Sequence, residues 1–487
     1  MHFHGAVWRR FSRDARGTIA IIFALVIIVV IFAIGTALDF GRAMNTASTF
    51  SGALDASALA AARAPCPPHE LFEQSLTVLY RILFLLFAEA RGLVPMWHPI
   101  YRDRYSIEAI VAELLAGRGY RGVWRAVLAI SRLAHAGCSA GELKVTAFNG
   151  RLFAPTHSPA FDRTRIEDAV MGDAVMAVGT TRTTAVGRTR ISYADLDVEQ
   201  LGAVYERVLE YMPARSGAPT LNQTREVRQS SGTFYTPRAV TAFLVRRTLE
   251  PLVRGRSAHE ILRLRVLDPA MGSGAFLVGA CRYLAGAVED SLIREGRWHS
   301  GDVSAADRAS VRREVAQRCL FGVDINPMAV QLARLSLWLA TLASDKPLTF
   351  LDHHLVCGDS LVGARVDDVM RQPPGGHTRQ HRAEALPLFE DADLAPTLQH
   401  AVRTRLQMAR DADDSAAVVA AKEKALAALN APRSPLGRWS AVLDLWCAAW
   451  FWEDGPPPDR ALFRELSDRL FGSAATLPEQ TSAPLLE

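Results

Sequence analysis

Three aspartates stand directly after short apolar stretches of the sequence: Asp268, Asp324 and Asp359. An apolar run of about four to eight residues predicts a buried strand, and open α/β sheets bind ligands beyond the carboxyl ends of their strands. After the first aspartate, Gly272 and Gly274 allow the chain to turn tightly and to approach a ligand closely. Carboxylates that can accept hydrogen bonds from hydroxyls, beside such a turn, are typical of a site for a nucleotide-like cofactor.

The elements that must position these aspartates alternate between strand and helix. A mostly apolar strand over 264–267 precedes the glycine turn, and a helix is expected to start near Ala275. A second buried strand, 320–324, leads into a helix with apolar residues at helical spacing. A third strand begins at His354. This order predicts a doubly wound α/β sheet with ligand groups at the strand ends.

The spacing of the first two aspartates departs from a simple βαβ unit. Such a unit places the second acid about 20 residues after the glycine loop, whereas Asp324 lies much farther beyond Asp268. The intervening stretch 291–317 is polar and rich in arginine. We therefore expect an inserted helix between the first two strands.

The residues around the first aspartate resemble a known family. Asp-Pro-Ala-Met-Gly-Ser-Gly-Ala-Phe-Leu, residues 268–277, resembles the S-adenosylmethionine loop of N6-adenine DNA methyltransferases. Ser-Gly-Thr-Phe-Tyr-Thr-Pro at 231–237 resembles the motif that precedes this loop in the family. The segments 320–327 and 358–361 are similar to its two later acidic motifs. All four segments occur in the family's order, which makes the resemblance specific.

The resemblance implies S-adenosylmethionine as the cofactor and gives individual residues a role. The loop from Asp268 to Gly274 would cradle the methionine part, and Asp324 would accept hydrogen bonds from the ribose hydroxyls. Asp359 would receive the adenine amino group. Phe276 and Ile325 would place apolar surface beside the adenine. The expected cofactor-binding set is Thr233, Tyr235, Thr236, Pro237, Asp268, Pro269, Ala270, Gly272, Ser273, Gly274, Phe276, Asp324, Ile325, Asn326, Asp359, Ser360 and Leu361.

Segments outside this region extend the resemblance to about residues 70–470. The stretches 79–93, 148–153 and 196–202 are similar to the helical region that precedes the catalytic domain in large restriction–modification methylases of the Eco57I or type IIG kind. The apolar run 79–87 is too short for a membrane span and contains Arg81, so we expect a core helix there. The predicted organisation is a helical region over 64–225, then a cofactor-binding part over 226–370, and finally a linker and helical insertion over 371–487.

The resemblance implies a site-specific adenine-N6 DNA methyltransferase of a restriction–modification system, with DNA as its partner. In the family, an Asn/Asp/Ser-Pro-Pro-aromatic motif holds the flipped adenine, and no segment of this chain matches it. Gln-Pro-Pro-Gly at 372–375 and Gly-Pro-Pro-Pro at 455–458 read as turns. We therefore predict no catalytic residue, an incomplete sheet and a truncated chain that is inactive alone. A separate polypeptide could carry the missing C-terminal half.

The N-terminal segment indicates a membrane protein. Residues 18–38 contain no charge and are long enough to span a bilayer core of about 30 Å. Arginines cluster before this stretch, which predicts a single-pass helix with a cytoplasmic N-terminus. Residues 1–63 resemble the N-terminal segment of Flp/Tad pilus-assembly proteins, with Ile22 where pilin-like members carry Glu.

These two resemblances lead to competing interpretations. An anchor of this orientation sends the methylase part across the membrane, away from S-adenosylmethionine and chromosomal DNA. The first interpretation is that the join near 64–68 is an artefact, which makes the methylase part cytoplasmic. The alternative is a membrane-anchored pilus-assembly-like or interaction protein with a vestigial methylase domain.

Composition is compatible with both interpretations. The net charge of +4 allows nucleic-acid binding without demanding it. None of the six cysteines has Cys-x-x-Cys spacing, and His353–His354 has no ligand spacing, so no metal site is predicted. The Glu-Leu-Lys sequence at 142–144 is the only suggestion of a nuclease, and ordinary surface chemistry is the better interpretation.

Overall fold

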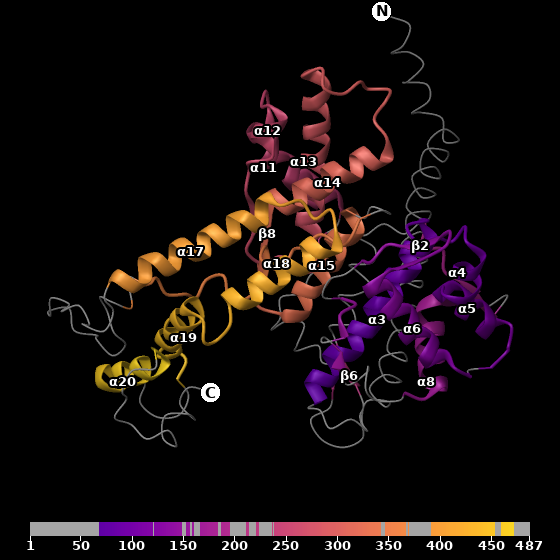
Figure 1. Cartoon of the computed structure of the whole chain (residues 1–487), viewed down its shortest axis with the longest axis horizontal. Helices are drawn as coiled ribbons and strands as arrows, with labels where there is room; N and C mark the ends of the chain where they lie inside the picture. The colour runs from indigo at the N-terminus through magenta and orange to yellow at the C-terminus, as the bar shows by residue number, and fades with distance from the viewer. Residues whose placement is uncertain are drawn as a thin grey trace, which may run out of the picture.

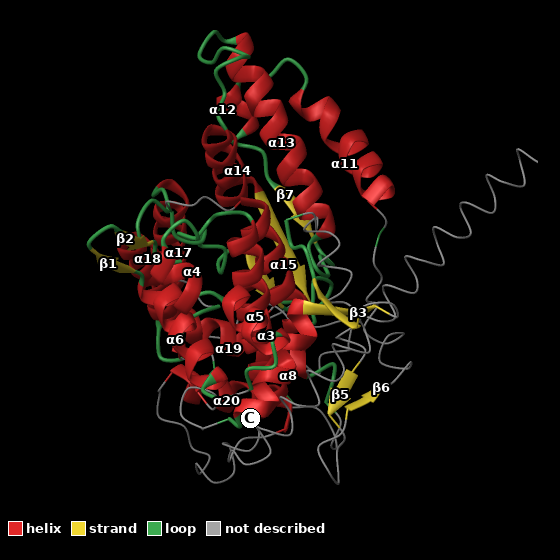
Figure 2. Cartoon of the chain, turned by 90° about the vertical axis from the view of Figure 1, so that its right-hand side faces the viewer, coloured by secondary structure: helices red, strands yellow, loops and turns green. Residues whose placement is uncertain are grey.

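A three-stranded parallel sheet forms the centre of the computed structural model (Figure 2). The strands are β7 (Val266–Asp268), β8 (Leu320–Asp324) and β9 (Leu355–Cys357), in that spatial order. Asp268 pairs in register with Gly322, and Asp324 pairs with Cys357. The predicted parallel α/β arrangement is thus confirmed. The second winding direction of a doubly wound sheet is not seen in the part of the chain that the structure describes.

The structure describes residues 68–471 except 120, 149–151, 156–157, 160–165, 184–186, 195–210, 214–220, 224–235, 237, 342–345, 367–368, 370–390 and 453–458. The predicted membrane helix at 18–38 and the N-terminal segment 1–63 therefore lie outside the described residues, as do Thr233, Tyr235 and Pro237. Among the described helices, none has both the length and the apolarity to cross a bilayer.

Two crossover helices pack on one face of the sheet. Helix α13 (Ala275–Arg294) begins at the residue that the sequence predicted, and α15 (Pro327–Thr341) connects β8 toward β9. The expected apolar positions of α15 are all buried: Val330, Leu332, Ala333, Leu335, Leu337 and Trp338. The periodicity identified this helix because its apolar positions face the core of the domain.

The predicted insertion is a separate helix, α14 (Ala305–Cys319), that precedes β8 and packs against both α13 and α15. A capping box starts it: the Ser304 hydroxyl accepts from the Asp307 N–H, and the Asp307 carboxylate accepts from the Ser304 N–H at 3.0 Å. This reciprocal pair satisfies two of the backbone donors that every helix start leaves without a partner.

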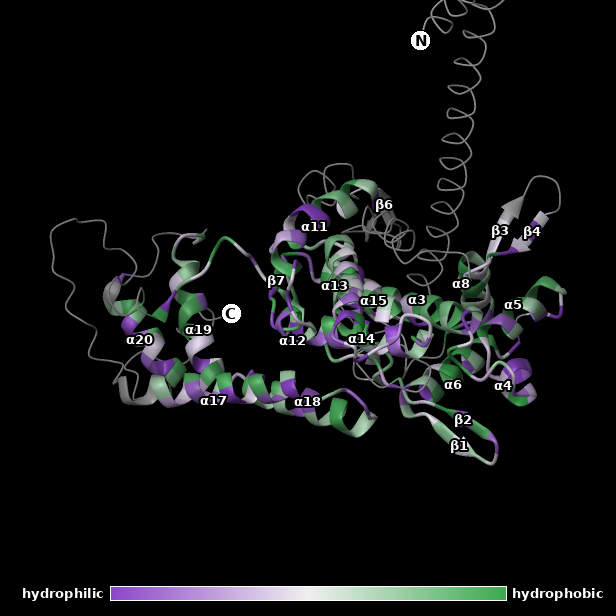
Figure 3. Cartoon of the chain, turned by 90° about the horizontal axis from the view of Figure 1, so that it is seen from above, coloured by the Kyte–Doolittle hydropathy of each residue, from purple (hydrophilic) through white to green (hydrophobic). Residues whose placement is uncertain are grey.

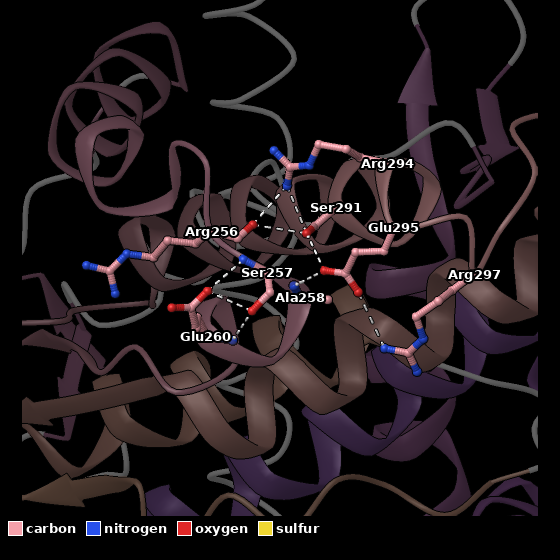
Figure 4. A network of polar contacts seen from close by, with 8 residues as sticks. All are labelled: Arg256, Ser257, Ala258, Glu260, Ser291, Arg294, Glu295 and Arg297. Atoms are coloured by element: carbon pink, nitrogen blue, oxygen red, sulfur yellow. Dashed lines mark hydrogen bonds and ion pairs between the residues drawn. The ribbon is translucent and has the colours of Figure 1, made fainter.

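Two helices lead into the first strand. Helix α11 (Arg238–Val253) packs along α13, and the short α12 (Ala258–Ile261) directly precedes β7. A polar network fixes α12 to the far end of α13 (Figure 4). The Glu295 carboxylate accepts from the Ala258 N–H at 2.9 Å and from the Ser291 hydroxyl at 2.9 Å. The network therefore helps to fix where β7 starts and, two residues later, where Asp268 stands.

The N-terminal region combines helices with small antiparallel hairpins. The predicted core helix is α3 (Pro68–Ala90). Every residue of its apolar run 79–87 is buried, including Arg81. The Arg81 guanidinium donates to the carbonyls of Leu152 and Ala154 at 2.7 and 3.0 Å, so it has a structural role.

The hairpins were not predicted, because their strands are too short to show a period of two. The remaining elements here are α4 (Pro99–Arg104), α5 (Ile107–Leu115), α6 (Val123–Ala136), α8 (Asp168–Gly179), β1 (Cys138–Ala140), β2 (Leu143–Val145), β3 (Thr180–Thr183), β4 (Gly187–Arg190), β5 (Tyr211–Pro213) and β6 (Leu221–Gln223).

The C-terminal helices form an elongated extension on the opposite side of the molecule from α4 and α5 (Figures 1 and 3). They are α17 (Asp391–Arg410), α18 (Ala416–Leu429), α19 (Pro435–Ala448) and α20 (Arg460–Phe471). We call residues 391–471 the C-terminal arm. Helix α18 ends with Asn430 as its C-cap.

Candidate functional site

The glycine loop that follows β7 is shaped by two residues with positive φ. Gly272 has φ 52° and Gly274 has φ 83°, conformations that cost a residue with a Cβ about 1–2 kcal/mol. Gly274 is also the N-cap of α13, and a Cβ there would lie 3.1 Å from the Cα of Ala333 on α15. Gly272, by contrast, faces open space. The loop thus needs one glycine for close helix packing and one for a turn that leaves room for a ligand.

Asp324, at the end of β8, holds this loop in place. Its Oδ2 accepts a hydrogen bond from the Gly272 N–H at 2.8 Å, and its Oδ1 accepts from the Asn326 N–H at 2.9 Å. The Met271 N–H donates to the Val323 carbonyl at 3.0 Å. Sequence reasoning gave Asp324 only a ligand-binding role. The structure adds a second role, because the same carboxylate connects the ends of two neighbouring strands.

Asp268, at the end of β7, has one carboxylate oxygen without a partner. Its Oδ1 accepts from the Ala270 N–H at 3.1 Å, whereas its Oδ2 is buried and makes no hydrogen bond. Burial, together with the nearby negative charge of Asp324, raises the pKa of Asp268. An unpaired carboxylate oxygen of this kind costs free energy until a donor or a cation meets it. The site therefore suits a ligand that brings a positively charged donor to Asp268.

The third acid lies two residues beyond the end of β9. Asp359 is exposed, and its Oδ1 accepts from the N–H groups of Leu361 and Val362 at 2.8 and 3.1 Å. The Gly358 N–H donates to the Asp324 carbonyl at 2.9 Å, which connects this turn to the end of β8. The three predicted aspartates therefore do stand at one edge of the sheet. The third strand is shorter than expected, because the chain turns at Gly358.

The apolar residues expected beside the adenine differ in exposure. Ile325 is 64% exposed and Leu361 is 94% exposed, so both present free apolar surface at the strand ends. Phe276 is half-buried and packs against the main hydrophobic core, so part of its ring serves the fold. Ile325 and Leu361 are therefore better placed than Phe276 to meet a planar ring.

The remaining predicted contact residues lie either in the turns that follow the strands or in the motif upstream of α11. Pro269, Ala270 and Ser360 are exposed, Ser273 is buried, and Asn326 is half-buried at the start of α15. Thr236 is the only described member of the upstream motif, and its carbonyl lies 3.5 Å from the Thr241 hydroxyl of α11.

Two residues that support the loop were missed from the sequence. Met271 is buried, and its sulfur occupies the space that a Cβ at Gly322 would fill. The same Cβ would lie 3.0 Å from Leu277 on α13. Gly322 therefore lets the cofactor loop and α13 lie directly on β8. A glycine inside a strand is the signal that could have revealed this close approach.

Comparison with known proteins agrees with this geometry. A family model for N-6 DNA methylases matches residues 197–424, a range that includes the sheet, the glycine loop and all three aspartates. A second family model, for putative Flp pilus-assembly TadE/G-like proteins, matches residues 17–64. The two resemblances that the sequence suggested are thus confirmed, and the matched ranges are separated by residues 65–196.

Three curated relatives match the methylase part. A putative type II restriction enzyme and methyltransferase of Methanocaldococcus jannaschii is 23% identical over 63% of this chain and 29% of its own length. The adenine-specific methyltransferase PglX of Streptomyces coelicolor is 34% identical over 28% of this chain and 10% of its own length. The type II restriction enzyme and methyltransferase Eco57I of Escherichia coli is 26% identical over 35% of this chain and 18% of its own length.

The chain therefore spans less than a third of the length of each of these relatives. The part of this chain that the family model covers holds the parallel sheet, whose strands end at the three aspartates and the glycine loop. Residues 197–424 of this chain are thus similar to the N-6 DNA methylase family.

Proposed function

We propose that the edge of the sheet formed by Asp268, Asp324 and Asp359 binds S-adenosylmethionine. The unpaired Oδ2 of Asp268 supports this proposal most directly, because it suits the ammonium group of the methionine part. Asp324 has one bond at each oxygen, and a carboxylate offers about four acceptor positions, so both oxygens can still accept from ribose hydroxyls. Bound S-adenosylmethionine would supply a methyl group on a positively charged sulfur.

Calorimetric titration of the full chain with S-adenosylmethionine tests this site. Hydrogen bonds to a charged group contribute about 1.5–3 kcal/mol, so Asp324→Ala should weaken binding roughly 10- to 100-fold. Asp290→Ala is the matched control, because Asp290 is an exposed acid on α13, far along the same domain. Absence of binding by the unaltered chain, or equal weakening by the control, would refute the site.

The acceptor of the methyl group is proposed to be the N6 amino group of adenine in DNA, within a restriction–modification system. The support is the family of residues 197–424 and the names of the three relatives. The chain contains no Asn/Asp/Ser-Pro-Pro-aromatic motif, and a bound cofactor does not replace the group that holds a flipped base. We therefore expect little transfer of labelled methyl to unmethylated DNA by this chain alone. Robust incorporation would show that another part of it holds the base.

A second function concerns the N-terminal segment. The TadE/G-like match over 17–64 and the uncharged stretch 18–38 support a membrane anchor, in which case the methylase part would serve a membrane-bound interaction protein. A reporter of membrane orientation fused after Ala64 tests this idea. An extracytoplasmic signal would support the anchor. A cytoplasmic signal would contradict it and would place the methylase part in the cytoplasm.

A further inference from the structure

Two neighbouring histidines lie where the sheet meets the C-terminal arm. His353 and His354 occupy the turn that leads into β9, and their ring centroids are 4.1 Å apart. The His354 ring lies 4.2 Å from the ring of Phe321 in β8, whereas the His353 ring stacks on Phe350 at 5.2 Å. Phe350 packs in one apolar cluster with residues of α17 and α18. The two imidazoles are therefore part of the contact that joins the arm to the sheet.

Both imidazoles have buried nitrogen atoms without a hydrogen-bond partner among the described residues. These atoms are Nδ1 and Nε2 of His353 and Nδ1 of His354. His354 also forms a hydrogen bond to the backbone of Ala316. Protonation gives an imidazole a second N–H donor and a full charge, and a buried charge without a partner is strongly unfavourable. The surroundings of both rings therefore favour the neutral form.

The cations around the pair oppose protonation further. Lys422 of α18 and Arg405 of α17 lie close enough to His353 to repel its protonated form. Arg265, directly before β7, acts in the same way on His354. Two of these three cations belong to the arm, so an imidazolium at the junction would be repelled by the arm itself.

The acids near the pair already have partners. Asp413 is close enough to favour a protonated His354, but its Oδ1 lies 2.6 Å from the Lys422 Nζ and its Oδ2 accepts from the Phe350 N–H at 2.7 Å. Asp352, which precedes the pair in the sequence, forms an ion pair with Arg334 at 3.3 Å. Neither carboxylate is thus placed to neutralise an imidazolium at no cost to the junction.

The direction of the pH dependence follows from these surroundings. Burial, together with Lys422 and Arg405, lowers the pKa of His353 from 6.5 to about 4. Burial and the neighbouring His353 also lower the pKa of His354. When a histidine pKa is lowered in the packed state, the solvated ring takes up a proton first. The stability of the junction is therefore complete above pH 6.5 and is lost as the pH falls toward 4.

We propose that His353 and His354 form a pH-sensitive switch that releases the C-terminal arm from the sheet in acid. In the neutral state both rings pack between Phe321 and Phe350 and the arm is docked. In acid the rings bind protons when the junction opens to water, which shifts the population toward the released arm. The switch is independent of the proposed cofactor site, to which neither histidine belongs.

Hydrogen exchange of the full chain tests the switch through the Phe350 amide, whose acceptor Asp413 belongs to the arm. The protection factor of an amide corrects for the pH dependence of intrinsic exchange. Between about pH 7.5 and about pH 5, we expect that of Phe350 to fall at least about 30-fold, the contribution of one released histidine. Amides of α13 should keep their protection, which distinguishes release of the arm from global unfolding.

Two substitutions should reduce the fall in protection. His353→Phe keeps an aromatic ring against Phe350 but binds no proton, so the fall should become about 30-fold smaller. Arg405→Glu, at an exposed position of α17, replaces a repelling cation by an acid and should also make the fall smaller. His400→Gln is the matched control, because His400 is an exposed histidine on the same helix.

Four results would overturn the proposal. They are a constant protection factor in the unaltered chain, an equal loss of protection in α13, an equal fall in His353→Phe, and an equally large reduction of the fall by His400→Gln. Circular dichroism at neutral pH checks that each variant is folded. Arg405→Glu changes an exposed side chain, so it keeps the test decisive if His353→Phe does not fold.

Discussion

The sheet domain and the C-terminal arm are held together by different kinds of interaction. One continuous hydrophobic core runs from Leu76 of α3 through α13 and α15 to Leu355 of β9. The arm instead has two small apolar clusters, one around Trp439 and Phe463 and one that joins Phe350 to α17 and α18. The proposed cofactor site belongs to the first region, where a large buried apolar area fixes the backbone.

The arm is attached to the sheet domain chiefly through buried polar groups. Asp413 is buried and forms an ion pair with Lys422 of α18, with Nζ and Oδ1 2.6 Å apart. Its Oδ2 accepts from the Phe350 N–H at 2.7 Å, and its carbonyl accepts from Arg313 of α14 at 2.9 Å. A buried pair of this kind depends on both partners, because either charge alone would be strongly unfavourable. We therefore expect one substitution to detach the arm, whereas the continuous core should tolerate the loss of a single contact.

The largest expected effect comes from Asp413→Asn. This change leaves Lys422 charged and buried without its partner, which costs about 3–5 kcal/mol. We expect limited proteolysis to cleave the arm from the sheet domain. Binding of S-adenosylmethionine should persist, because no residue of the proposed cofactor site lies in the arm. Loss of cofactor binding together with the arm would show that the sheet domain depends on the arm for its structure.

The next effect concerns a buried carboxylate in α3, a helix that contributes to the continuous hydrophobic core. Glu89 of α3 accepts from the N–H groups of Ile107 and Glu108 at 2.8 and 2.9 Å. Burial raises the pKa of Glu89 from 4.5 to about 8. A raised carboxyl pKa gives stability that is complete below pH 4.5 and is lost as the pH rises through 8. Thermal unfolding at several pH values should show a loss of up to about 5 kcal/mol over this window.

Glu89→Gln is the control for this pH dependence. The glutamine side chain does not ionise, so the loss of stability between pH 4.5 and 8 should largely disappear in the variant. An unchanged pH profile would assign the effect to another group.

A smaller effect is expected at Gly274. The positive φ of 83° and the Cβ position 3.1 Å from Ala333 both oppose alanine there. We expect Gly274→Ala to cost about 1–2 kcal/mol in the free energy of unfolding and to shift the start of α13, which should weaken cofactor binding. Gly286→Ala, in the same helix and with open space at its Cβ, is the control. A more stable Gly274→Ala variant would contradict the packing described for the loop.

The smallest effect should come from the exposed ion pair at the same junction as Asp413. Lys346 lies 2.7 Å from Asp414, a carboxylate that is largely exposed. Hydrogen bonding to Lys346 lowers the pKa of Asp414. Exposed pairs contribute about 0.2–1 kcal/mol and weaken with salt. Asp414→Asn should therefore leave the arm protected from proteolysis, and release of the arm would show that burial is not what distinguishes the two pairs.

The loop and the strand ends of the proposed cofactor site could be predicted from the sequence, because their signals are local. The loop 268–277 is a continuous stretch in which turn residues stand between a strand and a helix, and each aspartate follows its own strand. The apolar positions of α15 repeat with the helical period, and α14 begins with a capping sequence. Such features depend on near neighbours in the chain, so the residue types alone determine them.

Tertiary structure decided what depends on contacts between distant residues. Asp324 reaches Gly272, Met271 fills the space over Gly322, and Asp413 meets Phe350 and Arg313, all across long stretches of sequence. The exposure of Leu267 and Val356 is equally invisible in the sequence, where both residues look like ordinary buried strand positions. Burial and hydrogen bonding are properties of the packed chain. The sequence therefore determined which residues are candidates for the site, and only packing determined which of them also hold the loop and the strands together.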